Sequence, residues 1–285
     1  MKHLKIEGIV EKRFEKLNEA FDMARLHFHE DDIRIFRVKV KKLEACLGLI
    51  DAAKAHSRPV KLLPKMVKVN QLFGEIRTLQ MQQNHVQDRI KEMNIGSPDA
   101  YLKFISDQIL QHMEDIGKEL KGNQPFNKEE DKMMDLLPQQ LSKEAILQFV
   151  RSEGDIVEKL LEPIFPADKS FHEVRKHLKN LLYISPYVNL GMAALSPYKL
   201  LDNFEAIDEF TKVLGKFQDM NTALECLYCS APKIDADENE KISLRKLEEI
   251  WVEAREAFRV QIYDEIQKII ASGRTAATPV EWVVM

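Results

Sequence analysis

Two segments of this chain, 138 residues apart, carry the same pair of interleaved stripes, one apolar and one basic. In each segment the apolar residues recur at helical spacing, and the cations repeat that spacing one residue later. One residue along a helix turns the side chain by roughly 100°, so each cationic row lies beside the face that is buried. We therefore expect two related helices with cations along the margin of the core. The apolar rows are Ile33, Phe36, Val40, Leu43 and Phe171, Val174, Leu178, Leu181, and the basic rows are Arg34, Arg37, Lys41 and His172, Arg175, Lys179.

A second pair of segments indicates that the chain is internally duplicated. Residues 72–80 match residues 213–221 in their apolar pattern and in a central glycine, at an offset of 141 residues. The two matched segments occur in the same order in both parts of the chain. Because a glycine inside a helix costs roughly 1 kcal/mol relative to alanine, Gly74 and Gly215 predict places where helices approach closely.

The chain is predicted to be helical almost throughout, with four helices in each half. It has only ten glycines, and no sustained alternation of apolar and polar residues indicates strands. Asp32 is predicted to cap the first stripe helix, and Ser170 with Glu173 to form a capping box at the start of the second. A short helix is also expected at about 128–137, between the halves. The main helices are expected at about 5–28, 33–53, 60–92, 98–121, 141–161, 170–188, 198–229 and 240–272.

Length and duplication together favour one body made of two similar halves. At 285 residues and 45% hydrophobic content, the chain can bury a substantial core. We expect an all-α fold in which residues 1–285 form a single domain. Its parts are a first helical repeat at 1–125, a second at 139–272 and a C-terminal tail at 273–285.

The sequence also predicts a cytoplasmic protein without membrane association. No segment approaches the roughly 18 uninterrupted apolar residues of a membrane helix. The first seven residues lack the apolar core of a signal peptide. Three cysteines are too few for a disulfide framework, which fits a reducing compartment.

Two short motifs could hold a metal ion or a redox centre, and a simpler interpretation is favoured for both. Cys226 and Cys229 form a Cys-x-x-Cys pair without the strand-to-helix turn of a redox motif or the second ligand pair of a zinc site. Two small apolar residues on a helix are the favoured interpretation. His27 and His29 precede three acidic residues at an apparent helix junction, where a solvated loop is favoured over a metal site. Neither a metal nor a cofactor is expected.

Charge is segregated along the chain, although the formal net charge is only −4. Residues 33–91 hold thirteen Lys and Arg against four Asp and Glu, a net charge of +9. Residues 92–167 hold eight against fifteen, and residues 202–285 hold ten against seventeen, so each segment is at −7. Ordinary solvated helix faces are one interpretation of such a pattern. Because the cations lie beside an apolar stripe, where neighbouring helices crowd them together, a surface that attracts anions is the other.

The two basic segments resemble the twice-repeated signature of the CHAD domain, the conserved histidine α-helical domain. Each is followed by a segment, 74–80 or 215–221, that is similar to the family's Leu-Gly-x-x-(Arg/His)-Asp element, and the matched order covers nearly the whole chain. The resemblance implies two four-helix bundles related by a pseudo-twofold axis, with a central basic groove or pore that binds inorganic polyphosphate. The signature segments read Arg34-x-x-Arg37-Val38-x-x-Lys41-Lys42-Leu43 and His172-x-x-Arg175-x-x-x-Lys179-x-Leu181-x-Tyr183.

The implied function is binding of polyphosphate, or a related polyanion, without catalysis, and polyphosphate granules are a candidate partner. Arginine offers planar paired donors and lysine a mobile point charge, so rows of both can hold a flexible polyanion without requiring one register. Such binding should weaken with salt. The residues implied by the resemblance are Arg34, Arg37, Lys41, Lys42, His172, Arg175, Lys176 and Lys179.

The chain departs from the family pattern mainly in the second repeat. Arg34 stands where the family usually places its histidine, which keeps a cation in the first repeat. In the second repeat Asn180 and Leu182 stand where basic residues are common, and Gln218 replaces a typical histidine. His177 and Lys176 are expected to offset part of this loss, as are Lys61, Lys65 and Lys68, which share a face of the next helix in the first half. The first half is therefore expected to carry most of the binding.

Two other classes of function compete with polyanion binding. An enzyme acting on phosphates would need metal-binding carboxylates or a nucleophile, and no such constellation is visible in the sequence. An α-helical scaffold or interaction module, binding a protein or nucleic acid through the basic face, is the main alternative. Nucleic acid is not expected, because the aromatic residues Phe36 and Phe171 fall on the apolar stripe and not among the cations.

Overall fold

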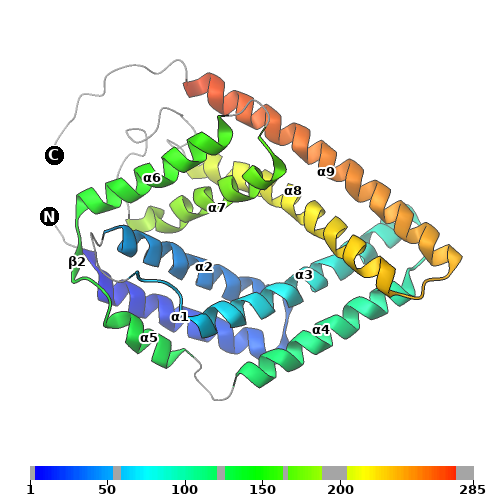
Figure 1. Cartoon of the computed structure of the whole chain (residues 1–285), viewed down its shortest axis with the longest axis horizontal. Coiled ribbons are helices and arrows are strands. Elements are labelled where there is room, and N and C mark those ends of the chain that lie inside the picture. Colours follow the sequence, from blue (N-terminus) through cyan, green and yellow to red (C-terminus); the bar gives the residue numbers. More distant parts are fainter. Residues whose placement is uncertain (1–3, 54–58, 121–125, 163–165, 188–203, 274–285) are drawn as a thin grey trace.

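The computed structural model describes residues 4–53, 59–120, 126–162, 166–187 and 204–273, and most of them are helical (Figure 1). The first half contains α1 (Ile6–His27), α2 (Glu30–Ala52), α3 (Pro64–Met93) and α4 (Asp99–Glu119). The second contains α6 (Lys143–Leu161), α7 (Asp168–Ile184), α8 (Phe204–Ser230) and α9 (Glu238–Gly273). The all-α prediction is confirmed. The smaller elements are α5 (Asn127–Met134), the antiparallel pair β1 (Leu4–Lys5) and β2 (Gln140–Leu141), and the 3-10 turns η1 (Ser185–Tyr187) and η4 (Ala231–Lys233).

The described helices lie close to the predicted ranges. The short helix expected at about 128–137 is α5, which ends at Met134. The predicted start of the helix at 198–229 lies outside the described residues, as does the tail beyond residue 273. The limits of the two repeats, 1–125 and 139–272, stay predictions.

The two halves meet through the stripe helices and through the helices that follow them. Within each half consecutive helices pack in pairs, α1 on α2, α3 on α4, α6 on α7 and α8 on α9. Between the halves, α2 packs on α7 and α6, and α3 packs on α8 (Figure 1). The apolar stripe residues are all buried, as their spacing predicts. The basic stripes consequently lie beside the contact between the halves.

Equivalent positions of the two halves meet where α3 packs on α8. Gln82 donates through Nε2 to the carbonyl oxygen of Ala223 at 3.2 Å, and to the hydroxyl of Tyr101 at 2.8 Å. Gln82 and Ala223 are separated by 141 residues, the offset between the matched segments. This contact fits the duplication, and the pseudo-twofold axis stays a prediction.

The prediction that Asp32 caps the first stripe helix is wrong. α2 begins at Glu30, and His29 at the N-cap position makes no side-chain capping bond. Asp32 lies inside the first turn, where three acidic residues favour the positive end of the helix dipole. Glu30 also forms an ion pair with Arg77 of α3. This contact between helices therefore stabilises a helix start at Glu30, before Asp32.

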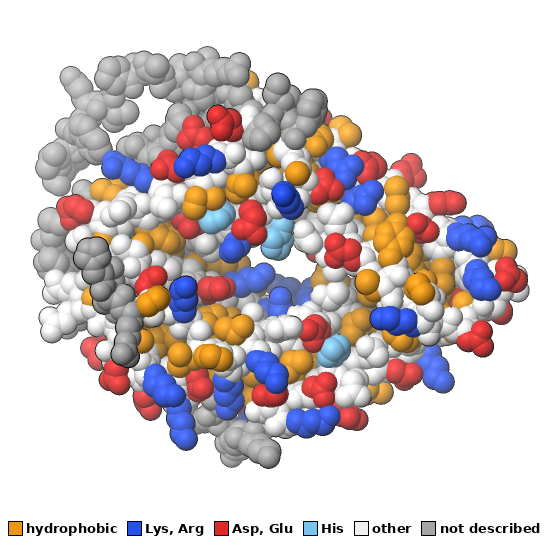
Figure 2. Space-filling model, in the orientation of Figure 1, with side chains coloured by type: hydrophobic (Ala, Val, Ile, Leu, Met, Phe, Trp, Pro, Cys, Tyr) orange, Lys and Arg blue, Asp and Glu red, His pale blue; other side chains and the backbone are white. Residues whose placement is uncertain are grey.

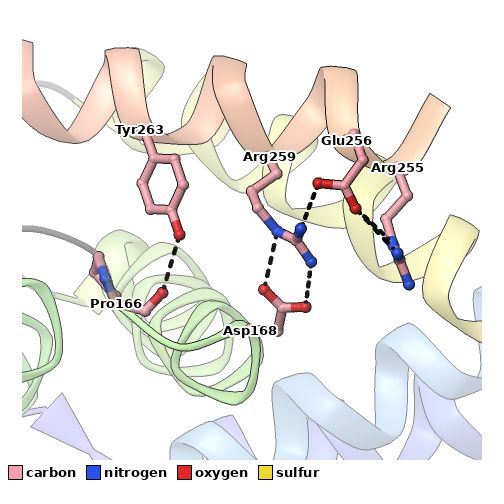
Figure 3. A network of polar contacts seen from close by, with 6 residues as sticks. All are labelled: Pro166, Asp168, Arg255, Glu256, Arg259 and Tyr263. Carbon is pink, nitrogen blue, oxygen red and sulfur yellow. Dashed lines mark hydrogen bonds and ion pairs between the residues drawn. The ribbon is translucent and has the colours of Figure 1, made fainter. Parts of the chain in front are cut away.

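The predicted capping box of Ser170 and Glu173 is also wrong, because α7 begins two residues earlier, at Asp168. The Asp168 carboxylate accepts from Arg259 Nε at 3.2 Å and from Nη2 at 2.6 Å (Figure 3). The Tyr263 hydroxyl donates to the carbonyl oxygen of Pro166 at 3.4 Å. These two contacts from α9 hold the start of α7, so Ser170 is already helical.

Candidate functional site

Two arginines, one from each half, are held in the same way. Arg37 of α2 donates through Nη1 to the carbonyl oxygen of Asn70 in α3, at 2.5 Å. Arg175 of α7 donates through Nε to the carbonyl oxygen of Thr211 in α8, at 3.3 Å. The two acceptors are 141 residues apart, so the duplication extends to the contacts of individual side chains.

The paired glycines make room for these two guanidinium groups. A Cβ atom on Gly74 would overlap Nη1 of Arg37 and lie 2.9 Å from its Cζ. A Cβ atom on Gly215 would lie 3.3 Å from Nε and 3.4 Å from Nη2 of Arg175. Each glycine therefore lets an arginine of the stripe helix lie against the backbone of the next helix.

Two lysines complete a group of cations to which both halves contribute. The pKa of Lys41 is lowered to about 8, first because the surrounding protein desolvates its ammonium group and then by the charges of Arg37 and Arg175, although the residue as a whole keeps contact with solvent. Lys179 of α7 also lowers the pKa of Lys41, and donates to Asp208 at 2.9 Å. Figure 2 shows a hollow near the middle of the molecule with Lys and Arg side chains at its margin. We call Arg37, Lys41, Arg175 and Lys179 the central group.

The charges of the central group are only partly compensated. Within the part of the chain that the structure describes, no carboxylate lies within 4.0 Å of Arg37, Lys41 or Arg175. Burial lowers the pKa of Arg37, and the charge of Arg77 lowers it further. Glu44 offsets part of the charge on Lys41, and Asp219 lies within electrostatic reach of Arg175. The cations of the group still repel one another, and an anion between them would relieve that repulsion.

A basic cavity of about 590 Å³ lies beside the central group, between α1, α2 and α7. Lys42 stands in it with its ammonium nitrogen 5.7 Å from the centre of the Tyr183 ring, a cation–π contact. The pKa of Lys42 is lowered by burial and then by the charges of Lys39 and Arg13. The cations that line the basic cavity are Lys12, Arg13, Lys16, Lys39, Lys42 and Lys179.

The other three residues implied by the resemblance are exposed, and two of them pair with a carboxylate on their own helix. Arg34 pairs with Asp31 at 3.2 Å, and Lys176 pairs with Glu173 at 3.5 Å, each on its own helix. His172 is exposed. The structure thus brings together Arg37, Lys41, Arg175 and Lys179, with Lys42 in the adjoining cavity.

Comparison with known proteins identifies the family. The CHAD domain model matches residues 8–228, which is more than half of the chain. The chain belongs to the CHAD domain family.

Solved structures support the same fold. The crystal structure of the CHAD domain from the plant Ricinus communis has a TM-score of 0.69 and 14% sequence identity, over 96% of this chain and 91% of that one. PptA from Streptomyces chartreusis has a TM-score of 0.64 and 12% identity, over 92% of this chain and 98% of that one. No curated protein matches the chain. At such low identities these two structures establish the fold of this CHAD domain and not its ligand.

The sequence did not identify the contribution of α1 to the basic surface of this CHAD domain. Lys12 and Lys16 are four residues apart and share one face of α1, with Arg13 beside them. Their spacing was a visible signal. Such a charge run is normally a solvated face, and only the packing of α1 on α2 places it next to Lys42.

A polar group between α3 and α8 adjoins the central group. The pKa of Asp219 is raised, because its burial outweighs the opposing effect of the nearby charges of Arg175, His85 and Arg77. Burial also lowers the pKa of His85. Gln218, which replaces a typical histidine of the CHAD signature, donates to Thr222 at 3.4 Å. On the side of the central group that faces α3 and α8, the carboxyl group of Asp219 therefore lies near cations.

The remaining motifs do not form a second centre in the described part of the chain. Cys226 and Cys229 lie on helix α8, as the favoured interpretation predicted, and neither forms a disulfide. His27 ends α1, and Phe28 makes the turn into α2 with a φ of 51°. Among the described residues, no three His, Cys, Asp or Glu side chains gather in a way that could hold a metal ion. Within the same ranges, every helix is too short or too polar to span a membrane.

Proposed function

We propose that this CHAD domain binds inorganic polyphosphate, or a closely related polyanion, in its central group. The observation that carries the proposal is the convergence of cations from both halves around Lys41. Arg37 lies on the same helix as Lys41, whereas Arg175 and Lys179 come from α7, and all three act on its pKa. A linear polyanion that passes between α2 and α7 would meet several of these charges at once.

The chemistry of the four side chains suits a flexible phosphate chain. A guanidinium group has five N–H donors, and Arg37 and Arg175 each direct one of them to a backbone carbonyl. The hydrogen bonds that hold these two groups against α3 and α8 reduce the entropy lost when a phosphate binds. Lys41 and Lys179 add point charges that follow the ligand without fixing its register.

The central group suits binding better than cleavage. Breaking a phosphoanhydride bond requires a positioned nucleophile or a general base beside the phosphorus. The four side chains of the central group offer cations and N–H donors, and Asp208 beside them is engaged by Lys179 and Lys212. We therefore propose retention of the polymer without its conversion.

The proposal predicts that replacing Arg37 and Arg175 by glutamine weakens binding of long-chain polyphosphate about 10- to 100-fold at 0.15 M salt, because two charge-assisted contacts are lost. Glutamine is preferred to glutamate because both guanidinium groups lie against backbone carbonyls, which would repel a carboxylate. Isothermal titration calorimetry measures the affinity, and circular dichroism checks the helix content.

The matched control replaces Arg34 and Lys176 by glutamine. This pair lies on the same two helices and removes the same charge, but both residues are exposed and paired locally. The control should lose less than about threefold in affinity, as expected for surface pairs. Equal losses in the two double variants would contradict a central site.

The alternative function is an interaction module that binds a protein through the basic face. It predicts no salt-dependent binding of the unmodified chain to polyphosphate, together with binding of a protein partner that R37Q/R175Q abolishes. That result would replace the proposal.

A further inference from the structure

The two halves differ in the helix that covers the stripe helix. An offset of 140 residues aligns α1 with α6, because their buried residues then coincide. The buried pairs are Ile6 with Ile146, Val10 with Val150, Leu17 with Val157, and Phe21 with Leu161. Positions in the basic cavity of the first half can therefore be compared with positions in the second.

None of the five cavity cations from α1 and α2 has a lysine or arginine at its equivalent position. At the positions equivalent to Lys12, Arg13 and Lys16 of α1, helix α6 has Ser152, Glu153 and Ile156. At the positions equivalent to Lys39 and Lys42 of α2, helix α7 has His177 and Asn180.

In the second half a carboxylate of the protein itself occupies the equivalent region. Glu153 Oε2 lies 3.1 Å from His177 Nδ1 and accepts from Asn180 Nδ2 at 3.0 Å. The side chains of Glu153 and His177 are only 10% and 15% exposed. An external anion would have to displace this buried carboxylate to reach the equivalent region of the second half.

In the first half Asp208 also lines the cavity, but it pairs with Lys179 and Lys212 and leaves the other lysines without a carboxylate partner within the described ranges. Among the described residues, no Asp or Glu lies within 4.0 Å of Lys12, Lys16, Lys39 or Lys42. Arg13 has a structural role, since it donates to the carbonyl oxygen of Tyr183 at 3.5 Å. Four lysines thus face a cavity of about 590 Å³, a volume sufficient for several phosphate groups.

The basic cavity and the central group are continuous. Lys179 lines the cavity and also acts on the charge of Lys41 in the central group. Lys41 and Lys42 are neighbours in α2, and each faces one of the two regions. A linear ligand could therefore run from one region into the other past Lys179.

We infer that a polyphosphate chain held by the central group continues into the basic cavity over α1, so that the site is extended on the first half only. The inference rests on the proposed function and specifies its ligand: a linear polyanion long enough to occupy both regions. A short anion would be held by the central group alone.

The inference predicts that K12Q/K16Q distinguishes long ligands from short ones. Affinity for long-chain polyphosphate should fall about fivefold through the loss of two exposed charge contacts, while affinity for tripolyphosphate changes less than about twofold. The slope of log Kd against log salt concentration for the long chain should also decrease by about one to two. Titration calorimetry of the full chain at several salt concentrations measures both quantities.

The matched control is R151Q/K159Q, which removes two exposed cations from the equivalent helix α6. It should leave both affinities within about twofold of the unmodified chain. An equal loss of long-chain affinity in K12Q/K16Q and R151Q/K159Q would overturn the one-sided extension, and so would an equal loss of tripolyphosphate and long-chain affinity in K12Q/K16Q.

A wrong extension and a wrong proposed function would give different experimental results. If R37Q/R175Q weakens binding as proposed while K12Q/K16Q behaves like its control, only the extension is wrong. If the unmodified chain binds neither ligand, the proposed function is wrong as well.

Discussion

At the scale of single residues, the site depends on glycines and backbone carbonyl groups, which carry no charge. Gly74 and Gly215 admit the guanidinium groups of Arg37 and Arg175, and the carbonyl oxygens of the preceding turns fix their direction. The sequence predicted close approach at both glycines. It could not identify an arginine as the approaching group, because that depends on how α2 and α7 are rotated against their neighbours.

Replacing Gly74 by alanine should separate site geometry from fold stability. The added Cβ overlaps the Arg37 guanidinium, a flexible group that can swing away, so polyphosphate affinity should fall about 5- to 10-fold through loss of one charged contact. The fold should not lose stability, because alanine favours a helix by about 1 kcal/mol over glycine. Calorimetric titration and urea unfolding measure the two effects.

Gly117→Ala is the control for this change, because a Cβ on Gly117 of helix α4 would meet nothing within 4 Å. It should raise stability similarly and leave binding unchanged. Unaltered affinity in G74A would show that the position of Arg37 does not matter for the ligand.

Lys41 should make polyphosphate binding depend on pH. Its pKa in the empty protein is about 8, and a bound polyanion favours the charged form and raises the pKa. Binding therefore takes up a proton, and affinity should fall at least about threefold between pH 7 and pH 9.5. Lys41→Arg stays charged over this range, so its affinity should change much less. Parallel pH profiles for the two proteins would contradict the role of Lys41.

The same shift has the opposite effect on the empty fold. The pKa of Lys41 is lowered from 10.5 to about 8, so between these values the unfolded chain binds more protons than the folded one. The free energy of unfolding attributable to Lys41 therefore rises as the pH increases from about 8 to 10.5. A protonated Lys41 therefore strengthens ligand binding and lowers the stability of the unliganded fold.

At the scale of helices, spacing predicted the elements well and their ends less well. The apolar stripes of α2 and α7 are buried as expected, because a periodic pattern reports directly which face meets the core. Both predicted caps failed, because contacts from distant helices, Arg77 to Glu30 and Arg259 to Asp168, set the helix starts. The basic face of α1 was missed for the same reason, since its role depends on packing.

At the scale of the whole molecule, segregated charge allows an acidic protein to present a basic centre. The formal net charge is −4, yet cations of both halves converge where α2 meets α7. The duplication was visible in the sequence, and so was the weaker second repeat. The sequence could not reveal that Glu153 lies against His177 and Asn180, because nothing in the motif of α7 points to α6.

A crystal structure of the full chain bound to tripolyphosphate would show whether the two halves together hold one polyanion. Phosphate oxygens of a single ligand should lie within hydrogen-bond distance, roughly 2.7–3.2 Å, of both Arg37 and Arg175, with Lys41 beside them. A ligand bound to only one half, or ordered phosphate only on the outer faces beside Arg34 and Lys176, would contradict this prediction.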